Sequence, residues 1–200
     1  MKYGIYDVEE SPSSLKEYVE GAHIIVLRTP SDYISTTISL EDEGWEVRDC
    51  IKIVLEGNTI QAGLFRKPFK GTVASNVIKN GCGGINIDGC RVPYGTQGSI
   101  ASNGSQVSPN EMGRFPANLV LSPYASKLMD EQAPVAGNLF KATRKKEVTS
   151  GGTGNSWKNV EKKAGGDNGH YDEPGGASRF FFRFEEREEM IDYLKRLISC

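Results

Sequence analysis

The chain has 200 residues, with 24 basic and 26 acidic side chains, a net charge of -2 and a pI near 5.8. This balance excludes a uniformly basic protein that would bind nucleic acid over its whole surface. The N-terminus is short and acidic, and no apolar run approaches the roughly 20 residues that cross a bilayer. We therefore expect one cytoplasmic domain over residues 1–200, with no membrane association.

The four cysteines predict free thiols rather than a metal site or a disulfide framework. Cys50, Cys82, Cys90 and Cys200 form no C-x-x-C pair, and both histidines lie far from them in sequence. Free thiols are typical of a reducing compartment. The 23 glycines cluster in loops, so we expect ordered elements separated by mobile insertions.

Hydrophobic periodicity in the first third of the chain predicts an α/β sheet. Residues 22–27 (AHIIVL) form an apolar run of the length expected for a buried, parallel strand. His23 begins that run with no nucleophile or acid beside it, which favours a structural role over a catalytic one. Before that strand, we expect an edge strand at 3–8 and a helix at 15–20. After it, we expect a helix from 29 to 43 and a strand at 45–55 with a bulge near Asp49. A strand at 59–66 is the expected antiparallel partner of the strand at 45–55.

The helix that ends at residue 43 begins with the sequence Thr-Pro-Ser-Asp. Ser31 or Asp32 is its expected N-cap, because a short polar side chain can accept a hydrogen bond from the first turn. Its expected apolar stripe consists of Ile34, Ile38 and Leu40.

Residues 71–93 (GTVASNVIKNGCGGINIDGCRVP) contain a helix end followed by a turn signal. The helical pattern over 73–78 stops at Gly81, which predicts a C-cap. Asp88 and Gly89 stand between two short alternating segments. That pattern predicts a two-residue hairpin with a type I′ turn and positive φ at Gly89.

The second half of the chain alternates ordered elements with two Gly-rich stretches. Residues 94–112 are polar and are expected to be mobile, because burial cannot offset the entropy of ordering them. The expected elements are a strand at 116–121, a helix at 122–131 capped by Ser122, a core strand at 178–184, and an amphipathic helix at 185–198 with a stripe of Met190, Ile191, Leu194, Leu197 and Ile198.

Residues 133–176 lack regular periodicity and carry the largest basic excess in the chain. Between residues 141 and 163, seven basic side chains stand against two acidic ones, a net charge of +5. Cations bind phosphate, and an indole offers a stacking face for a base. By composition alone, a solvated flexible loop explains the segment slightly better than a binding surface. The candidate DNA-binding residues are Lys141, Arg144, Lys145, Lys146, Trp157, Lys158, Lys162 and Lys163.

Three segments resemble, in order, parts of bacterial and phage site-specific DNA methyltransferases that modify adenine N6 or cytosine N4. They are FRKPFKGTVASNVIKNGCGGINIDGCRVP at 65–93, GRFPANLVLS at 113–122 and GGASRFFFRF at 175–184. EGWEVRDCIKIV and EEMIDYLKRLIS also resemble family segments, so the resemblance extends over roughly residues 16–198. Three segments in the family's order are more specific than any one of them.

This resemblance implies a partial Rossmann-like sheet, mixed in strand direction, with an antiparallel hairpin at its edge and long Gly-rich loops. It implies S-adenosylmethionine as cofactor and double-stranded DNA as partner. The family also places its variable target-recognition segment in the part of the chain that residues 133–176 occupy. The resemblance therefore favours a DNA-binding segment there, whereas composition alone slightly favours a solvated loop. A phage-encoded protein of this kind would act in the host cytoplasm.

Two hallmark motifs of the family do not occur in these 200 residues: the D-P-F-x-G-x-G cofactor loop and the D/N/S-P-P-Y tetrapeptide that holds the flipped base. Residues 11–14 (SPSS) and 122–124 (SPY) are the nearest sequences, each with one proline. One interpretation is a shortened or split enzyme, completed by a partner chain or a second copy. The other is a non-catalytic methyltransferase-like module that binds DNA or protein, for example in anti-restriction or regulation. The loss of both motifs favours the second for the isolated chain.

Overall fold

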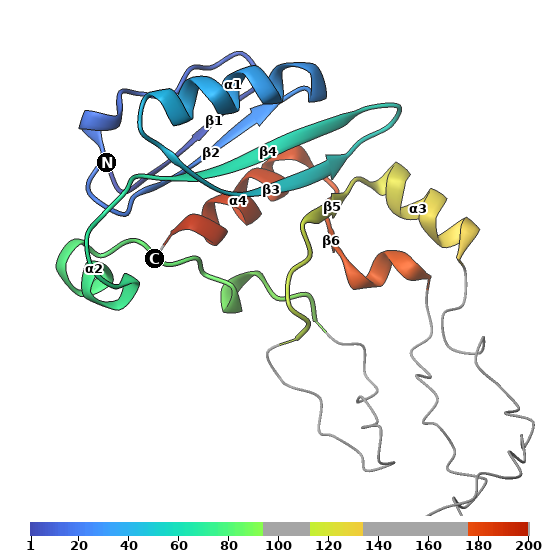
Figure 1. The fold of residues 1–200 in the computed structure, drawn as a ribbon. Helices are drawn as coiled ribbons and strands as arrows, with labels where there is room; N and C mark the ends of the chain where they lie inside the picture. Colours follow the sequence, from blue (N-terminus) through green and yellow to red (C-terminus); the bar gives the residue numbers. More distant parts are fainter. Residues whose placement is uncertain (94–112, 134–175, 200) are drawn as a thin grey trace, which may run out of the picture.

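The computed structural model describes residues 1–93, 113–133 and 176–199. Within them, a six-stranded sheet carries helices on both faces (Figure 1). The elements are β1 (Tyr3–Tyr6), η1 (Leu15–Glu17), β2 (His23–Arg28), α1 (Pro30–Asp42), β3 (Glu46–Val54), β4 (Thr59–Arg66), α2 (Val73–Asn80), η2 (Asp88–Cys90), β5 (Leu119–Leu121), α3 (Pro123–Gln132), η3 (Ala177–Phe180), β6 (Phe182–Arg183) and α4 (Arg187–Ile198).

The strands lie in the order β1-β2-β4-β3-β5-β6. β4 runs antiparallel to both of its neighbours, and the other neighbouring pairs are parallel. The sheet confirms the predicted α/β class and the mixed strand directions, and β1 lies at an edge as predicted. The place predicted for the antiparallel hairpin is wrong: β3 and β4 lie in the interior of the sheet, because β5 and β6 join it later in the chain and cover the outer side of β3.

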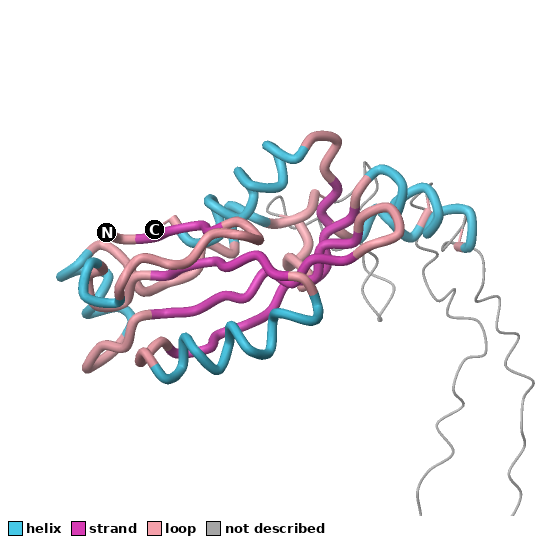
Figure 2. Tube along the Cα trace, turned by 90° about the horizontal axis from the view of Figure 1, so that it is seen from above, coloured by secondary structure: helices cyan, strands magenta, loops and turns pink. Residues whose placement is uncertain are grey.

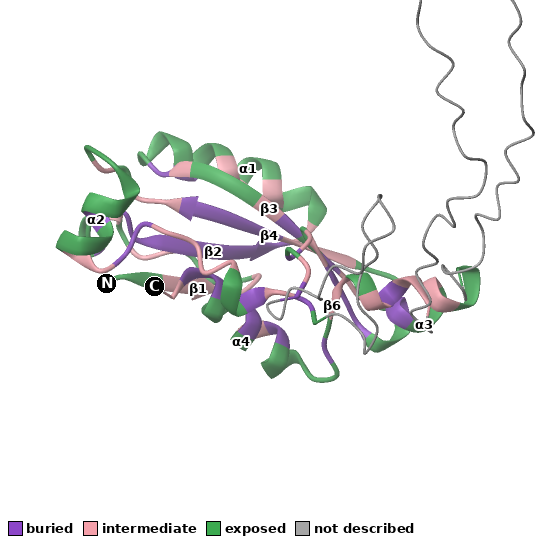
Figure 3. Cartoon of the chain, turned by 90° about the horizontal axis from the view of Figure 1, so that it is seen from below, coloured by how far each residue is buried: buried purple, intermediate pink, exposed green. Residues whose placement is uncertain are grey.

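Two apolar layers sandwich the sheet, one under each helical face. Ile24 and Val26 of β2 pack in a cluster with Leu40 of α1. Ile25 and Leu27 point the other way, into the larger cluster that includes α4. β2 is therefore buried on both faces, which explains its continuous apolar sequence. Seen from above, α1 runs alongside the strands (Figure 2). Seen from below, the buried strands contrast with the largely exposed helices α1 and α2 (Figure 3).

The predicted apolar stripe of α1 is wrong in phase. Leu40 is buried, but Ile34 and Ile38 are 67% and 54% exposed. Tyr33 packs on the sheet instead, and a Cβ on Gly63 of β4 would lie 2.9 Å from the Tyr33 ring. The missing side chain at Gly63 makes room for the tyrosine and sets the rotation of the helix.

The N-cap of α1 is Thr29, not Ser31 or Asp32. Its side chain accepts a hydrogen bond from the backbone N–H of Asp32 at 3.3 Å. Pro30 then occupies the first helical position, where its missing N–H costs nothing. The proline therefore fixes the helix start two or three residues earlier than the polar side chains alone indicate.

The predicted hairpin at Asp88 and Gly89 is wrong. These residues belong to the 3-10 turn η2, and Gly89 does not have a positive φ. The Asn86 side chain accepts a hydrogen bond from Gly89 N–H at 3.0 Å, and Asn86 N–H donates to Leu197 O of α4 at 2.9 Å. A backbone bonded to a helix has no strand partner, so tertiary contacts override the local turn signal.

Two further elements are shorter than predicted. The helix expected at 15–20 is the single turn η1. The strand expected at 178–184 is the turn η3 followed by two strand residues, because Asp130 binds the backbone and hydroxyl of Ser178 and curls the chain there.

Other predictions are confirmed by the geometry. The register of β3 and β4 shifts between Val47 and Asp49, which is the predicted bulge. Gly81 ends α2 with a φ of 67°, and Ser122 caps α3. Residues 119–121 form β5 within the predicted strand, and α4 buries its predicted stripe except for the partly buried Ile191. Within the described part of the chain, Cys50, Cys82 and Cys90 form no disulfide bond.

The helices among the described residues include none that is both long and apolar enough to span a bilayer. The predicted mobile loop at 94–112 lies outside the described residues. So does the predicted target-recognition segment at 133–176, except for its two ends.

Candidate nucleic-acid interface

All eight candidate DNA-binding residues lie between positions 134 and 175, outside the described part of the chain. The two ends of that segment are described and lie together. Ala177 N–H donates to Ala133 O at 3.1 Å. Asp130, in the last turns of α3, accepts from Ser178 N–H at 2.8 Å and from Ser178 Oγ at 2.7 Å. The described structure therefore holds both ends of the candidate segment at one point.

The ends of the other gap are held in the same way. Val92 and Arg114 form an antiparallel bridge, with N–O distances of 3.1 Å and 2.7 Å. Arg114 Nη1 donates to Pro93 O at 2.9 Å, and Arg91 Nη1 donates to Gly113 O at 3.3 Å. Gly113 has a φ of 89°, which a side chain would resist, so the glycine permits this tight return.

These two junctions meet at the ring of Phe180. The guanidinium carbon of Arg114 lies 4.9 Å from the ring centroid, and that of Arg179 lies 4.3 Å from it. Both distances suit cation–π contacts. We call five side chains at these two junctions the junction surface: Arg91, Arg114, Phe115, Arg179 and Phe180.

Two carboxylates of the described residues lie at these junctions, and each is bonded to a neighbouring group. Asp88 is paired with Arg91, with the atoms 2.8 Å apart. Burial raises the pKa of Asp130, but the hydrogen bonds from Ser178 and the charges of Arg183 and Arg179 outweigh it, so that the pKa is lowered. Asp130 is therefore ionised at neutral pH, and its negative charge interacts favourably with Arg183 and Arg179.

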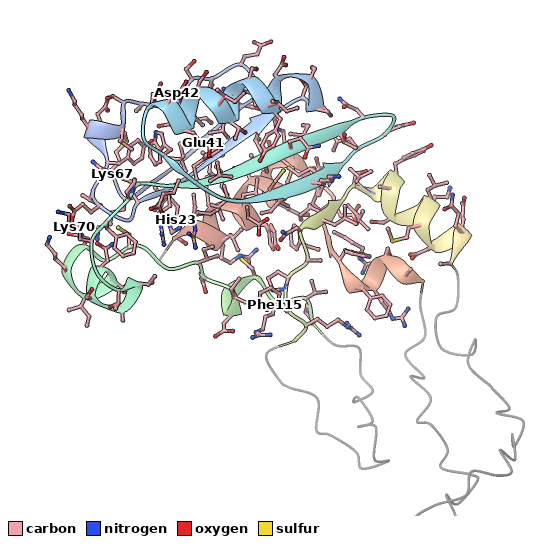
Figure 4. The ribbon with its side chains drawn as sticks, viewed as in Figure 1. His23, Glu41, Asp42, Lys67, Lys70 and Phe115 are labelled. Carbon is pink, nitrogen blue, oxygen red and sulfur yellow. The ribbon has the colours of Figure 1, made fainter. Side chains whose placement is uncertain are left out.

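The aromatic side chains of the junction surface reach solvent. Phe115 is 66% exposed and Phe180 is 37% exposed. Figure 4 shows Phe115 on the side of the sheet away from α1. Exposed rings beside guanidinium groups are typical of surfaces that bind nucleic-acid strands. Our reading of the sequence missed this surface, although the two Arg-Phe dipeptides at 114–115 and 179–180 could have indicated it.

A second candidate place is the edge of the sheet where the parallel strands end, since ligands of α/β sheets bind there. A cleft of about 630 Å³ lies between the loop after β1, the β3–β4 turn and the start of α4. Its lining includes Asp7, Glu9 and Glu10, and Arg187 pairs with Asp7 across it. Arg28, 8% exposed, holds the loop by donating to Asp7 O at 2.8 Å and Glu10 O at 2.6 Å.

The two sequences nearest to the family tetrapeptide have structural roles. In residues 11–14, Ser13 N–H donates to Tyr6 Oη at 3.1 Å and Ser14 caps η1. In residues 122–124, Ser122 Oγ accepts from Ala125 N–H at 3.3 Å and starts α3. Neither stretch presents its polar atoms as a base-binding site.

His23 is buried at 1% exposure, at the start of β2 near Lys67 (Figure 4). Burial, with the charges of Arg66 and Arg48, lowers its pKa to about 4. Among the described residues, no group hydrogen-bonds to His23 Nδ1, and no cluster of three or more His, Cys, Asp or Glu side chains could hold a metal ion. A neutral buried imidazole agrees with the structural role predicted for His23.

The three segments that carry the methyltransferase resemblance contact one another. Val92, of the first, pairs with Arg114, of the second. β5 of the second segment pairs with β6 of the third through Val120 and Phe182. Comparison with known proteins adds nothing to this geometry: no protein-family model and no curated protein matches the chain.

Proposed function

We propose that this protein binds DNA in DNA modification, as a shortened or split form of an S-adenosylmethionine-dependent amino-methyltransferase. The observation that carries the proposal is the convergence of the three resembling segments. They are far apart in sequence, yet Val92, Arg114 and Phe180 meet at one place. Segments that resemble one family and also lie at one place in the fold support a common site.

The strand order gives a second, independent support. β2, α1, β3 and β4 follow one another as strand, helix, strand and reversed strand. That is the order in which the methyltransferase family closes its sheet. Such an order alone is compatible with many α/β proteins, so it carries less weight than the convergence.

The cleft beside β1 favours a non-catalytic form of this function, in which the chain binds DNA or a partner protein in anti-restriction or regulation. The family tetrapeptide stands at the end of a strand, where its polar groups meet the base. Here the loop after β1 is engaged by Arg28 and Arg187, and its side chains include Asp7, Glu9 and Glu10. A carboxylate-rich loop repels phosphate and lacks the paired prolines, so we expect no methyl transfer by this chain alone.

DNA binding is tested by fluorescence anisotropy of a labelled duplex over a series of salt concentrations. We expect binding that weakens with salt, because the candidate lysines and arginines would release counterions from phosphates. Replacing Lys145 and Lys146 together with Ala should lower the magnitude of the log-affinity against log-salt slope by roughly 2, with little change in melting temperature. Wild-type protein without salt-dependent binding at low ionic strength would refute the proposal.

Cofactor binding is tested by calorimetry with S-adenosylmethionine, alone and with duplex DNA. We expect no tight binding by the 200-residue chain, because its sequence lacks the D-P-F-x-G-x-G loop, whose glycines let the backbone approach the cofactor. A dissociation constant in the low micromolar range, about -8 kcal/mol, would contradict this expectation and favour the catalytic form.

A further inference from the structure

The apolar side chains of α2 face solvent. The helix has one buried residue, Asn76, whose side-chain amide donates to Glu20 O at 2.9 Å and to Cys82 O at 2.7 Å. An amphipathic helix normally turns its apolar side toward the protein interior. Here a polar side chain takes that place, and four exposed apolar residues make up a neighbouring side of the helix: Val73, Ala74, Val77 and Ile78. The apolar side of α2 is therefore uncovered in this chain.

α1 carries a second exposed apolar stripe, which ends in carboxylates. Ile34 and Ile38 are four residues apart, so they lie on one side of the helix, and they are 67% and 54% exposed. Glu41 and Asp42 continue that stripe, because they follow Ile38 by three and four residues, and Figure 4 shows both at the end of α1. The helix dipole disfavours negative charge at a C-terminus, and the last turn contains no basic residue.

The charges in and beside the two helices have opposite sign. Residues 29–44, which include α1, contain four acidic side chains and no basic one. Residues 67–81, which include α2, contain three lysines and no acidic side chain. Lys79 pairs with Glu20 at 3.5 Å, and both of these side chains are more than half exposed. Lys70 is exposed and forms no ion pair with another described residue. The two exposed helices are therefore complementary in charge, and each offers an apolar stripe.

We propose that a second copy of this chain covers α2, with the isoleucines of its α1 packed on Val77 and Ile78 and the acidic end of that α1 beside Lys70. Stripes of side chains three and four residues apart are the surfaces through which helices pack on one another. Contact would remove the exposed isoleucines from water, and the opposite charges would favour α1 on α2 over two like helices. This inference goes beyond the proposed DNA binding and does not depend on it.

Such a contact joins two different faces of one chain, so it is heterologous. Each copy in a pair would keep one unused α1 face or one unused α2 face, and the pair could add further copies. The test measures the mass of the full 200-residue chain by sedimentation velocity over a series of protein concentrations. We expect wild-type protein to pass from monomer to dimer and then to larger species as its concentration rises.

Two variants remove one face each. Ile38→Gln alters α1 and leaves α2 intact, and Ile78→Gln alters α2 and leaves α1 intact. Both side chains are exposed and Gln is a good helix former, so each variant should keep the melting temperature of the wild type. Each variant alone should self-associate at least about 10-fold more weakly than the wild type. An equimolar mixture should form a dimer and nothing larger, because it contains one intact pair of faces.

The matched control is Leu128→Gln, which removes a 42% exposed apolar side chain from α3 and should associate like the wild type. A third variant tests the charges. Replacing Glu41 and Asp42 together with Lys should also weaken association at least about 10-fold, because like charges would then meet at the contact.

Each contrary result overturns a stated part of the inference. Wild-type protein that stays monomeric at every concentration would overturn the second copy as the partner of α2. Association that neither Gln variant weakens would overturn the role of these two helices. Association that only one of them weakens would overturn the contact of α1 with α2 in favour of a symmetric contact between like helices. DNA binding is measured separately on duplexes, so its failure would leave this inference standing, and the reverse also holds.

Discussion

Replacing Asn76 with Ala should destabilise the fold more than any exposed change in α2. Asn76 is 4% exposed and lies in the segment that resembles the methyltransferases. Its Nδ2 donates to Glu20 O at 2.9 Å and Cys82 O at 2.7 Å, and its Oδ1 accepts from Asn80 Nδ2 at 2.8 Å. These bonds tie α2 to the loop before β2 and to the loop after α2.

The size of the effect follows from those bonds. Each buried hydrogen bond contributes about 0.5–1.5 kcal/mol, and an acceptor left without its donor costs more. The Ala variant loses the two donated bonds and leaves a small cavity where the amide group was. Together these changes should lower the free energy of unfolding by about 2–3 kcal/mol. For a chain of this length, that corresponds to a fall in Tm of roughly 4–12 °C.

The assay is urea denaturation followed by far-ultraviolet circular dichroism. Lys79→Ala is the control, because Lys79 pairs with Glu20 at 3.5 Å on the surface and should change stability by less than about 0.5 kcal/mol. Asn76→Asp should cost more than Asn76→Ala at neutral pH, because it puts a carboxylate against two carbonyl oxygens. Its folded-state pKa would be raised, so its deficit should shrink as pH falls. An Asn76→Ala variant as stable as Lys79→Ala would refute the reasoning.

Two further predictions concern pH and backbone strain. Because the pKa of His23 is lowered to about 4, the unfolded chain binds a proton that the folded one does not between pH 4 and 6.5. Stability should therefore rise with pH across that window by about 3 kcal/mol, and His23→Gln should flatten the rise in urea titrations; an unchanged slope would contradict the shift. Gly113→Ala should destabilise more than Gly57→Ala. Both glycines have positive φ, but only at Gly113 would a Cβ meet a backbone oxygen, that of Val92, at 2.5 Å. Equal melting temperatures for the two variants would show that this clash is relieved.

Local signals predicted the elements whose ends are fixed by their own residues. Gly81 stops α2 and Ser122 starts α3 because each acts on the turn beside it. The alternation in β3 revealed even its bulge near Asp49, since a change of phase in the apolar pattern has few other causes.

Distant contacts decided the elements that the sequence did not predict. Asn86 binds α4, so the Asp-Gly signal yields a 3-10 turn, and Gly63 rotates α1 so that Tyr33 packs inward. Asp130 and Ser178 are far apart in the chain, so the curl at η3 had no local signal. For the candidate site, the sequence indicated basic charge in 141–163 but not the junction surface, because its arginines come from segments that only the fold brings together.

The short pairing of the last strands has a consequence for local opening. β3 and β4 share eight residue pairs, whereas β5 and β6 share two. Opening of β6 breaks few ladder bonds, so its amide protons should exchange with solvent far sooner than those of β4. β6, which follows Arg179 and Phe180, can then open locally without global unfolding. A ligand bound there would first be detected as slower amide exchange in β6, before any rise in Tm.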